Sequence, residues 1–419
     1  MTFARLRKIR KVVEAITNRN KKSQINQEPK DPSTKFVITS RESSALITST
    51  IIGAGVLTLP RPASEIAHQS AWLATLCGGI VIFFVMWAIT KLGLRFPGKT
   101  FVEYTGDLIG IKRSETVGKL VALPILLFFI LMWLGMMVAA IRLFGEAIVS
   151  AVLPETPLEV IVGIFLLALL ALLIVELEVI VRFNEILLPV IILPVTFVSV
   201  LSLQNAELTN IFPMFKIDLF TFLKGVVSQM FAYQGFTIML LFMAYVQRGK
   251  NVGASTIGIA LPTFNYILIV FATVAVFGFE ELQHLTWPTL ELMKSTDFSF
   301  FILERIESAF VAIWVVAVYT TAGNLFYAVC FAFAQILPTK KEDTARKWIG
   351  VCLLPVAFWL VFLPENVYQL FQWSKYIGYA GLVAFAIPFV LLLLAVIRKQ
   401  GKGAPRRHEK KRQKNHSSP

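Results

Sequence analysis

Long apolar segments recur along almost the whole chain, and they limit the folds that the chain can adopt. We count about ten between residues 43 and 397, and each is long enough, or nearly so, to cross roughly 30 Å of hydrocarbon at a rise of about 1.5 Å per residue. They lie at 43–66, 70–94, 119–148, 157–176, 184–203, 221–246, 254–278, 305–337, 348–364 and 374–397. Lipid offers the backbone no hydrogen-bonding partners, so apolar spans of this length must form helices. The pattern predicts an all-α, multi-pass membrane protein of about ten transmembrane helices.

The composition argues against a soluble protein. Only 16% of the residues are charged and 56% are hydrophobic, whereas a soluble domain carries about 25% charged residues. The net charge of +14 would suit a nucleic-acid-binding protein, but the cations gather at the two ends of the chain and in short hydrophilic loops. In a membrane protein such clusters contact anionic lipid headgroups and set the orientation. We therefore expect membrane lipid as a partner and no nucleic acid.

The charged loops predict the topology. If the N-terminus is cytoplasmic, the inside loops carry Arg95, Arg182, Arg248 and Lys340 among other cations, and the outside loops are poorer in Lys and Arg. An even number of spans then returns the C-terminus to the same side. The predicted organisation is a basic cytoplasmic tail at 1–42, a transmembrane domain at 43–397 and a second basic cytoplasmic tail at 398–419. Residues 3–17 of the first tail are expected to form an amphipathic helix on the membrane surface.

The first apolar segment contains a candidate helix break. It reads Ile51-Ile52-Gly53-Ala54-Gly55-Val56-Leu57-Thr58-Leu59-Pro60, with two glycines in the middle of the span and a proline shortly after. Because glycine and proline weaken the helical hydrogen-bond ladder, we expect a break near Gly53–Gly55. A break would present a half-helix N-terminus, whose N–H groups suit a carboxylate. The alternative is close helix packing through small residues.

The sixth apolar segment carries a second interruption, Phe231-Ala232-Tyr233-Gln234-Gly235-Phe236. The first and sixth of ten spans are corresponding members of a five-plus-five inverted repeat. Interruptions at matching positions of two halves indicate a transporter-type site near the middle of the bilayer. We therefore expect the two interrupted helices to enclose a binding site for a small polar molecule.

Two further segments contribute candidate residues for this site. Thr320 and Asn324 lie four residues apart on one face of the eighth segment, although threonine hydroxyls often bond only to their own helix. Met132 and Trp133 of the third segment would wall the ligand or simply pack in the core. The predicted ligand-binding residues are Ile52, Gly53, Ala54, Gly55, Val56, Met132, Trp133, Phe231, Ala232, Tyr233, Gln234, Gly235, Phe236, Thr320, Thr321 and Asn324. In the third segment Arg142 and Glu146, four residues apart, form either a gate or an interfacial ion pair.

Catalysis is not predicted. The sequence has no P-loop, no G-x-S-x-G elbow and no H-E-x-x-H motif. The four histidines fall in predicted loops or in the C-terminal tail, and the three cysteines lie apart from one another in apolar segments. We expect neither an enzyme nor a cofactor, and no metal site apart from a weak sodium possibility.

Several segments resemble a known family. The stretch from Ile52 to Pro60 resembles the first-helix signature of the amino acid–polyamine–organocation transporter superfamily. Further segments, in their order and spacing, resemble the spore germination permease family, which comprises the B subunits of nutrient germinant receptors in endospore-forming bacteria. They are Ala71-Trp72-Leu73, Phe96-Pro97-Gly98-Lys99-Thr100, Asn184-Glu185-Ile186-Leu187, Phe212-Pro213-Met214-Phe215, Trp287-Pro288-Thr289-Leu290-Glu291-Leu292 and Glu304-Arg305-Ile306-Glu307.

The resemblance implies a LeuT-like 5+5 inverted repeat with broken helices 1 and 6, and a pocket walled by helices 3 and 8. It also implies a small germinant, typically an amino acid, and partnership with an A-type membrane subunit and a C-type lipoprotein. The implied location is the inner membrane of the endospore. The whole would act as a sensor that triggers germination.

A ligand pose follows from the two predicted breaks. The carboxylate of an amino acid would bind the N–H groups of Ala54, Gly55 and Val56, and its ammonium would bind carbonyls near Ile51 and Ala232. On this hypothesis Gly55→Leu abolishes the ligand response and leaves the fold intact. The alternatives are an H⁺- or Na⁺-coupled amino acid permease, with sodium held near Ala317, Thr320 and Thr321, and a structural subunit that passes water or ions.

Overall fold

The computed structural model describes residues 37–109, 115–213, 216–247, 252–296, 306–337, 339 and 341–401. From residue 38 onward these belong to one compact unit, Ile38–Pro419. The amphipathic helix predicted at 3–17 lies outside the described residues, as does most of both predicted tails.

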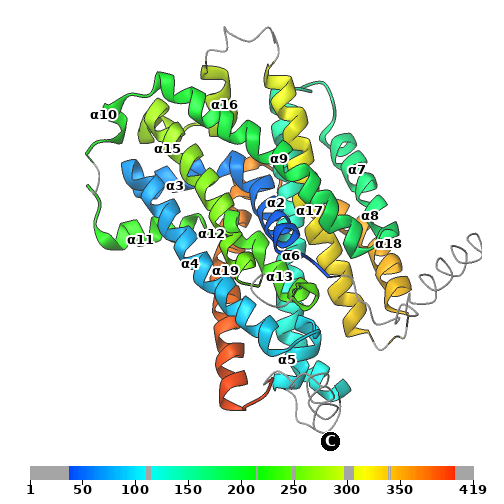
Figure 1. Ribbon diagram of the computed structural model, residues 1–419. Coiled ribbons are helices and arrows are strands. Elements are labelled where there is room, and N and C mark those ends of the chain that lie inside the picture. The colour runs from blue at the N-terminus through cyan, green and yellow to red at the C-terminus, as the bar shows by residue number, and fades with distance from the viewer. Residues whose placement is uncertain are drawn as a thin grey trace, which may run out of the picture. The chain divides into compact units, whose positions relative to one another are not determined.

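Each of the ten predicted apolar segments contains helix (Figure 1). In chain order the helices of these segments are α2 (Ser40–Thr58) with α3 (Pro60–Ala67), α4 (Ala71–Arg95), α6 (Glu115–Ala151), α7 (Leu158–Leu169) with α8 (Ala171–Ile174), α9 (Leu177–Ser202), the sixth segment from α11 (Leu219–Ser228) onward, α14 (Val252–Ile257) with α15 (Ala260–Leu282), α17 (Ile306–Ile336), α18 (Glu342–Val361) and α19 (Val367–Ile397). Short helices that the sequence analysis did not predict are η1 (His68–Ser70), α5 (Phe101–Ile109), η2 (Leu203–Asn205), α10 (Leu208–Ile211) and α16 (Pro288–Ser295).

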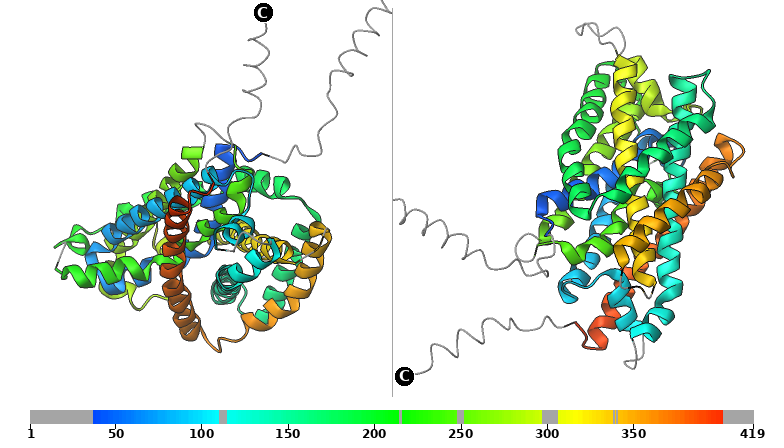
Figure 2. Two further views of the ribbon diagram at one scale, coloured as in Figure 1. Left: turned by 90° about the horizontal axis from the view of Figure 1, so that it is seen from below. Right: turned by 90° about the vertical axis from the view of Figure 1, so that its right-hand side faces the viewer.

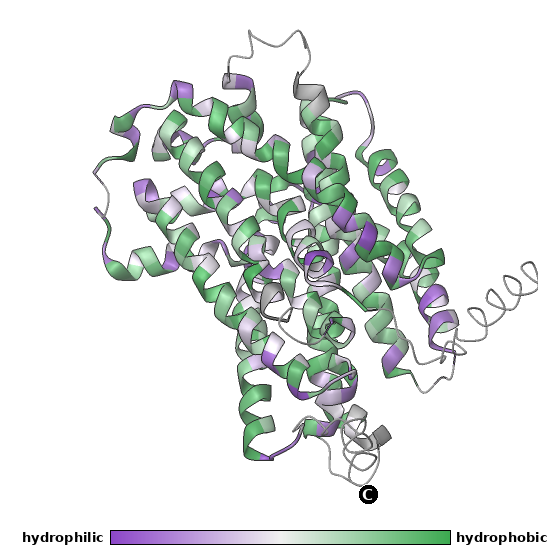
Figure 3. Ribbon diagram, viewed as in Figure 1, coloured by the Kyte–Doolittle hydropathy of each residue, from purple (hydrophilic) through white to green (hydrophobic). Residues whose placement is uncertain are grey.

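The protein is a multi-pass membrane protein. Within the described residues, seven helices are long and apolar enough to cross a membrane, or eight if one bent pair forms a single span, and the apolar helix at Leu158–Ile174 is shorter. Hydrophobic residues cover most of the long helices in Figure 3. Strand pairing among the described residues is limited to one bridge, between Ile38 and Val246.

The helix α2 lies inside the bundle, and it contacts α17, α9, α14 and α15. Its residues Leu46, Ile47 and Ile51 are at most 2% exposed. The helices α6 and α17 run side by side through the bundle, as both views of Figure 2 show. By contrast, α9 and α18 expose many apolar side chains, which is expected of surfaces that face lipid.

The start of α2 is fixed by local hydrogen bonds and by the sixth segment. Thr39 and Glu42 form a capping box, which satisfies two N–H groups at the helix start. Immediately before it, the N–H of Ile38 donates to the Tyr245 carbonyl and the Ile38 carbonyl accepts from Gln247, both at 2.8 Å. The start of α2 is thereby tied to the end of the sixth segment.

The first segment is divided at Leu59, between α2 and α3. The expectation of a break at Gly53–Gly55 is wrong, because α2 is helical through both glycines and Leu59 still donates to the Gly55 carbonyl. Pro60 begins α3 and has no N–H for the carbonyl of Val56. The Thr289 hydroxyl donates to that carbonyl instead, at 2.6 Å.

The two glycines serve close packing, which was the alternative interpretation. A Cβ on Gly53 would lie 2.1 Å from the Thr321 hydroxyl, and a Cβ on Gly55 would lie 1.9 Å from the Tyr266 hydroxyl. A glycine inside a helix costs only about 1 kcal/mol relative to alanine. Here the tertiary contacts offset that cost, so the helix persists.

The sixth segment is interrupted, as the sequence predicts. It begins at α11, whose N-cap Asp218 accepts the N–H and the hydroxyl of Thr221, and these bonds hold the pKa of the Asp218 carboxyl below its ordinary value. After Ser228 the chain bends by 41°. The remainder alternates between short α and 3₁₀ helices, namely α12 (Met230–Tyr233), η3 (Gln234–Ile238), α13 (Met239–Phe242) and η4 (Met243–Tyr245). A 3₁₀ stretch inside a helix often marks a functional hinge.

Candidate functional site

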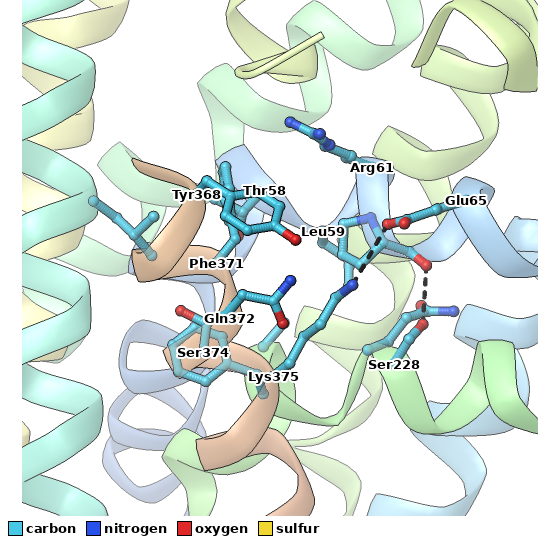
Figure 4. Close-up of a pocket in the computed structure, with 15 residues that line it drawn as sticks. Thr58, Leu59, Arg61, Glu65, Ser228, Tyr368, Phe371, Gln372, Ser374 and Lys375 are labelled. Atoms are coloured by element: carbon cyan, nitrogen blue, oxygen red, sulfur yellow. Dashed lines mark hydrogen bonds and ion pairs between the residues drawn. The ribbon is translucent and has the colours of Figure 1, made fainter. Parts of the chain in front are cut away.

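The two helix discontinuities border one cavity of about 150 Å³ (Figure 4). Its walls come from the α2–α3 junction, from the α11–α12 junction, from α19 and from Leu143 of α6. Pockets for drug-sized ligands measure about 300–1,000 Å³. The cavity is therefore suited to a small molecule. It lies beside Pro60, where the first segment lacks one helical hydrogen bond, and beside the bend after Ser228 in the sixth segment.

Charged side chains of both signs line the cavity. Lys375 of α19 points toward Glu65 of α3 (Figure 4), with 3.9 Å between Nζ and Oε2. Arg61 of α3 lies over the Phe371 ring, 5.4 Å from its centroid. The Lys375 and Glu65 side chains are 35% and 44% exposed, and a long, exposed ion pair of this kind contributes little to stability. Both groups can therefore exchange their partner for the opposite charges of a ligand.

A hydroxyl joins the two junctions. The Ser228 Oγ lies 2.9 Å from the carbonyl oxygen of Pro62 and 2.8 Å from that of Gly225. Its single proton is donated to one of them at a time. Next to it, Gln229 donates to the Gly225 carbonyl and accepts from the Thr75 hydroxyl at 2.6 Å. These contacts connect the end of α11 to α3 and α4.

The predicted ligand-binding residues divide into two groups in the structure. Phe231 and Ala232 line the cavity. The others whose side chains the structure describes are closely packed within the bundle around α2, η3 and α17. Side chains at most 5% exposed in this second group are Ile52, Val56, Met132, Trp133, Tyr233, Gln234, Phe236, Thr320, Thr321 and Asn324.

The Thr321 hydroxyl bridges two backbone groups of α2. It donates to the Ser49 carbonyl at 2.6 Å and accepts from the Gly53 N–H at 3.1 Å. These two backbone groups are the partners of a single i to i+4 rung. The indole N–H of Trp314 donates to the Gly53 carbonyl at 2.8 Å. The glycine pair thus marks a place where α17 reaches into the backbone of α2, although the helix does not end there.

Asn324 belongs to a buried polar network between three helices. Its amide donates to the Thr50 hydroxyl at 2.8 Å, and it exchanges hydrogen bonds with the amide of Asn184 on α9. Thr320 takes no part, because its hydroxyl donates to the Ala317 carbonyl of its own helix at 2.8 Å. The network supplies the hydrogen-bond partners that the buried side-chain amide of a mid-span asparagine needs.

The oxygens of the candidate sodium ligands, Ala317, Thr320 and Thr321, all take part in hydrogen bonds within the protein. The Ala317 carbonyl accepts from Thr320, and the Thr321 hydroxyl bridges Ser49 and Gly53. In the parts of the chain that the structure describes, no group of three or more His, Cys, Asp or Glu side chains is placed to hold a metal ion.

Arg142 and Glu146 form a direct ion pair at 2.8 Å. The Arg142 side chain is 7% exposed, it donates to the Val361 carbonyl at 3.3 Å, and it lies over the Phe362 ring. The pair therefore connects α6 to the end of α18. The described contacts do not place it in the cavity.

Sequence reasoning missed four residues of this region. Arg61 and Glu65 lie four residues apart on α3, whereas Lys375 comes from α19, far along the chain, and no local pattern pairs it with them. Tyr266 of α15 is fully buried, and its hydroxyl donates to the Ile51 carbonyl at 2.7 Å and lies 3.3 Å from the Ala232 carbonyl. One signal was available for Tyr266, because a tyrosine inside an apolar span needs a hydrogen-bond partner.

The sequence matches a known family. A family model described as "Spore germination protein" matches residues 37–370. Spore germination protein YndE of Bacillus subtilis (strain 168) is 27% identical over 367 residues, which cover 87% of this chain and 98% of that protein. Spore germination protein GerLB of Bacillus cereus is 26% identical over 371 residues, which cover 87% of this chain and 96% of that protein.

Solved structures identify the fold. MhsT in complex with L-phenylalanine aligns with a TM-score of 0.61 at 14% identity, covering 86% of this chain and 90% of that one. A variant of the Eremococcus coleocola manganese transporter aligns with a TM-score of 0.54 at 16% identity, covering 87% of this chain and 81% of that one. The fold is therefore the LeuT-like arrangement expected from the sequence. At these identities the likeness concerns the fold alone.

Proposed function

The chain belongs to the spore germination protein family, and from that premise we propose that it is the B subunit of a nutrient germinant receptor. The observation that carries this proposal is the cavity between the two helix discontinuities, which has charges of both signs on its walls. A small zwitterion is the ligand that such a lining suits. The germination proteins and the transporters that resemble the chain are not enzymes, and we propose a binding function without catalysis.

The proposed ligand is a free amino acid. Its carboxylate binds Lys375 and Arg61, and the negative charge of Glu65 favours entry of its ammonium into the cavity. The earlier expectation of a carboxylate on the N–H groups of residues 54–56 does not fit this arrangement, because α2 is helical there. The closely packed residues around α2 and α17 form the floor of the site in this proposal. Ligand binding triggers germination only if it favours one arrangement of these helices over another.

The proposed setting is that of the family resemblance. The chain acts with an A-type membrane subunit and a C-type lipoprotein in the inner membrane of the endospore, with both termini in the cytoplasm. The relatives' names support a role in germination. Partners, location and orientation are part of the proposal.

Binding and uptake of the twenty labelled L-amino acids by proteoliposomes that contain this chain alone test the function. Saturable binding without accumulation is expected of a receptor subunit. Accumulation driven by an H⁺ or Na⁺ gradient would instead identify an amino acid permease. Passage of water or ions without amino acid binding would identify a conduit subunit.

Lys375→Gln is expected to weaken amino acid binding roughly fivefold, which corresponds to about 1 kcal/mol for a partly exposed charge pair. The substitution keeps the polar side chain but removes the cation that faces Glu65. Equilibrium binding to detergent-solubilised protein measures the effect. Lys224→Gln is the matched control, because Lys224 is an exposed cation on α11 over the Phe220 ring. Equal affinities for the two variants would contradict the placement of the ligand.

A further inference from the structure

Tyr266 connects the two interrupted helices through carbonyls of Ile51 and Ala232. Its hydroxyl lies 2.7 Å from the carbonyl oxygen of Ile51 on α2 and 3.3 Å from that of Ala232 on α12. Ala232 is also a wall residue of the cavity. The hydroxyl is therefore held between one backbone oxygen of each helix, next to the space that a ligand would enter.

Two convergent carbonyl oxygens from different helices form a seat for a cationic donor. A primary ammonium has three N–H donors and a positive charge, whereas a tyrosine hydroxyl has one proton. An ammonium can satisfy both oxygens at once with charge-assisted hydrogen bonds, which are stronger than neutral ones. The hydroxyl makes a short hydrogen bond to the Ile51 carbonyl, but it lies at a longer distance from the Ala232 carbonyl.

The room at this seat fits one heavy atom with its donors. A Cβ on Gly55 would lie 1.9 Å from the Tyr266 hydroxyl and 3.0 Å from the Cβ of Ala232. Glycine at position 55 thus leaves a space that the hydroxyl alone fills. The Tyr266 ring in turn meets the Tyr233 ring edge to face, 5.1 Å between centroids, and the Tyr233 hydroxyl lies 3.1 Å from the Thr75 carbonyl on α4.

We propose that the Tyr266 hydroxyl occupies the seat of the ligand's ammonium and must leave it when the ligand binds. This inference rests on the proposed function, because it assumes an amine-bearing ligand in the cavity. In the absence of ligand, Tyr266 keeps α2 and α12 together. Binding transfers both carbonyls to the ammonium and moves the ring against Tyr233, which carries the change to α4.

Tyr266→Phe tests the proposal. The variant removes the hydroxyl and leaves two buried carbonyls without this donor in the free protein, so the ligand no longer has to displace one. The expected result is roughly tenfold tighter binding of the labelled L-amino acid that the wild-type protein binds in the panel, about 1.4 kcal/mol at 25 °C. The desamino analogue of the same amino acid, used as a competitor, gains nothing because it has no ammonium.

Thr289→Val is the matched control, because it removes another buried hydroxyl that donates to a carbonyl of α2, that of Val56. We expect it to lower the melting temperature without tightening binding. Tyr266→Met, which also lacks a donor, serves if the phenylalanine variant does not fold. A gain of affinity for the amino acid alone, seen only in the Tyr266 variants, supports the proposal.

Other outcomes separate the two hypotheses. If the Tyr266 variants bind the amino acid no tighter than the wild type does, Tyr266 is a structural tie, and the inference is overturned while the proposed function stands. An equal gain for the desamino analogue overturns it as well. Absence of amino acid binding by both wild type and variants overturns the proposed function, and the inference with it.

Discussion

Gly235→Ala is expected to leave little folded protein, because the new Cβ would lie 2.4 Å from the carbonyl oxygen of Thr50 and 2.7 Å from its carbonyl carbon. Both are backbone atoms of α2, so the clash is relieved only if η3 and α2 move apart as whole segments. Overpacking that neighbours can absorb costs about 1–3 kcal/mol. Here the neighbour is a buried helix backbone, and we expect a loss above about 3 kcal/mol, against a total stability of about 5–15 kcal/mol.

The measurement is the yield of monodisperse protein after detergent extraction, followed by its melting temperature. Gly163→Ala in α7 is the matched control, because the nearest atom to its new Cβ is a ring carbon of Phe358 at 4.0 Å. Alanine in a helix interior is favoured over glycine by about 1 kcal/mol, so this variant should be at least as stable as the wild type. If both variants fold equally well, α2 and η3 are not in the close contact described.

The same reasoning changes the expectation for Gly55. From the sequence alone, Gly55→Leu is expected to abolish the ligand response with the fold intact. The structure contradicts the expectation of an intact fold, because even a Cβ at this position would lie 1.9 Å from the Tyr266 hydroxyl. A leucine there displaces Tyr266 and destabilises the bundle. A lost response in that variant would therefore not identify a ligand contact.

The helices were predictable because the apolar segments are long and polar residues mark where most of them end. The interruption of the sixth segment was predictable as well, since Gln234 and Gly235 stand out within an apolar helix. The position of the break in the first segment was not. A glycine in a sequence is compatible with a break and with close packing, and the choice depends on Thr321 and Tyr266, which pack against it from segments far along the chain.

Two of the short helices have start signals in the sequence. Thr100 and Glu103 form the pattern of a capping box at the start of α5, and the Thr100 N–H donates to Glu103 at 2.7 Å. Pro288 stands at the first position of α16, where proline is favoured. These helices are too short for the apolar periodicity that revealed the spans, so only their caps could have indicated them.

The cavity lies beyond what local sequence patterns can show. Glu65 and Lys375 come from α3 and α19, and their pairing follows from how the helices pack. Mid-span polar residues were the more visible signal, and the structure places most of them in satisfied internal hydrogen bonds. The buried polar groups therefore pointed to the central helices, whereas the charged residues that line the cavity lie on α3 and α19.

Thr321→Val is expected to lower the free energy of unfolding by about 2 kcal/mol. Valine has nearly the shape of threonine but offers neither a donor to the Ser49 carbonyl nor an acceptor to the Gly53 N–H. Each buried polar group left without a partner costs about 1–3 kcal/mol. At 3% exposure, water has little access to replace the hydroxyl. Unfolding in mixed detergent–denaturant micelles measures the loss.

The adjacent residue supplies the control. Thr320 is equally buried, but its hydroxyl donates only to the Ala317 carbonyl of its own helix, so Thr320→Val should change stability by less than about 0.5 kcal/mol. Equal losses for the two variants would show that α2 does not depend on the Thr321 bridge.

The same pair of variants decides whether sodium has a place between α2 and α17. A cation there would need the oxygens of Ala317, Thr320 and Thr321, which the protein already uses in hydrogen bonds. We therefore expect the melting temperature of the wild type to be the same in sodium and in choline chloride, since an ion that binds only the folded state raises it with concentration. A rise in sodium that both valine variants lose would mean that the Thr321 bridge opens to admit the ion. The permease hypothesis would then account for the site better than a receptor does.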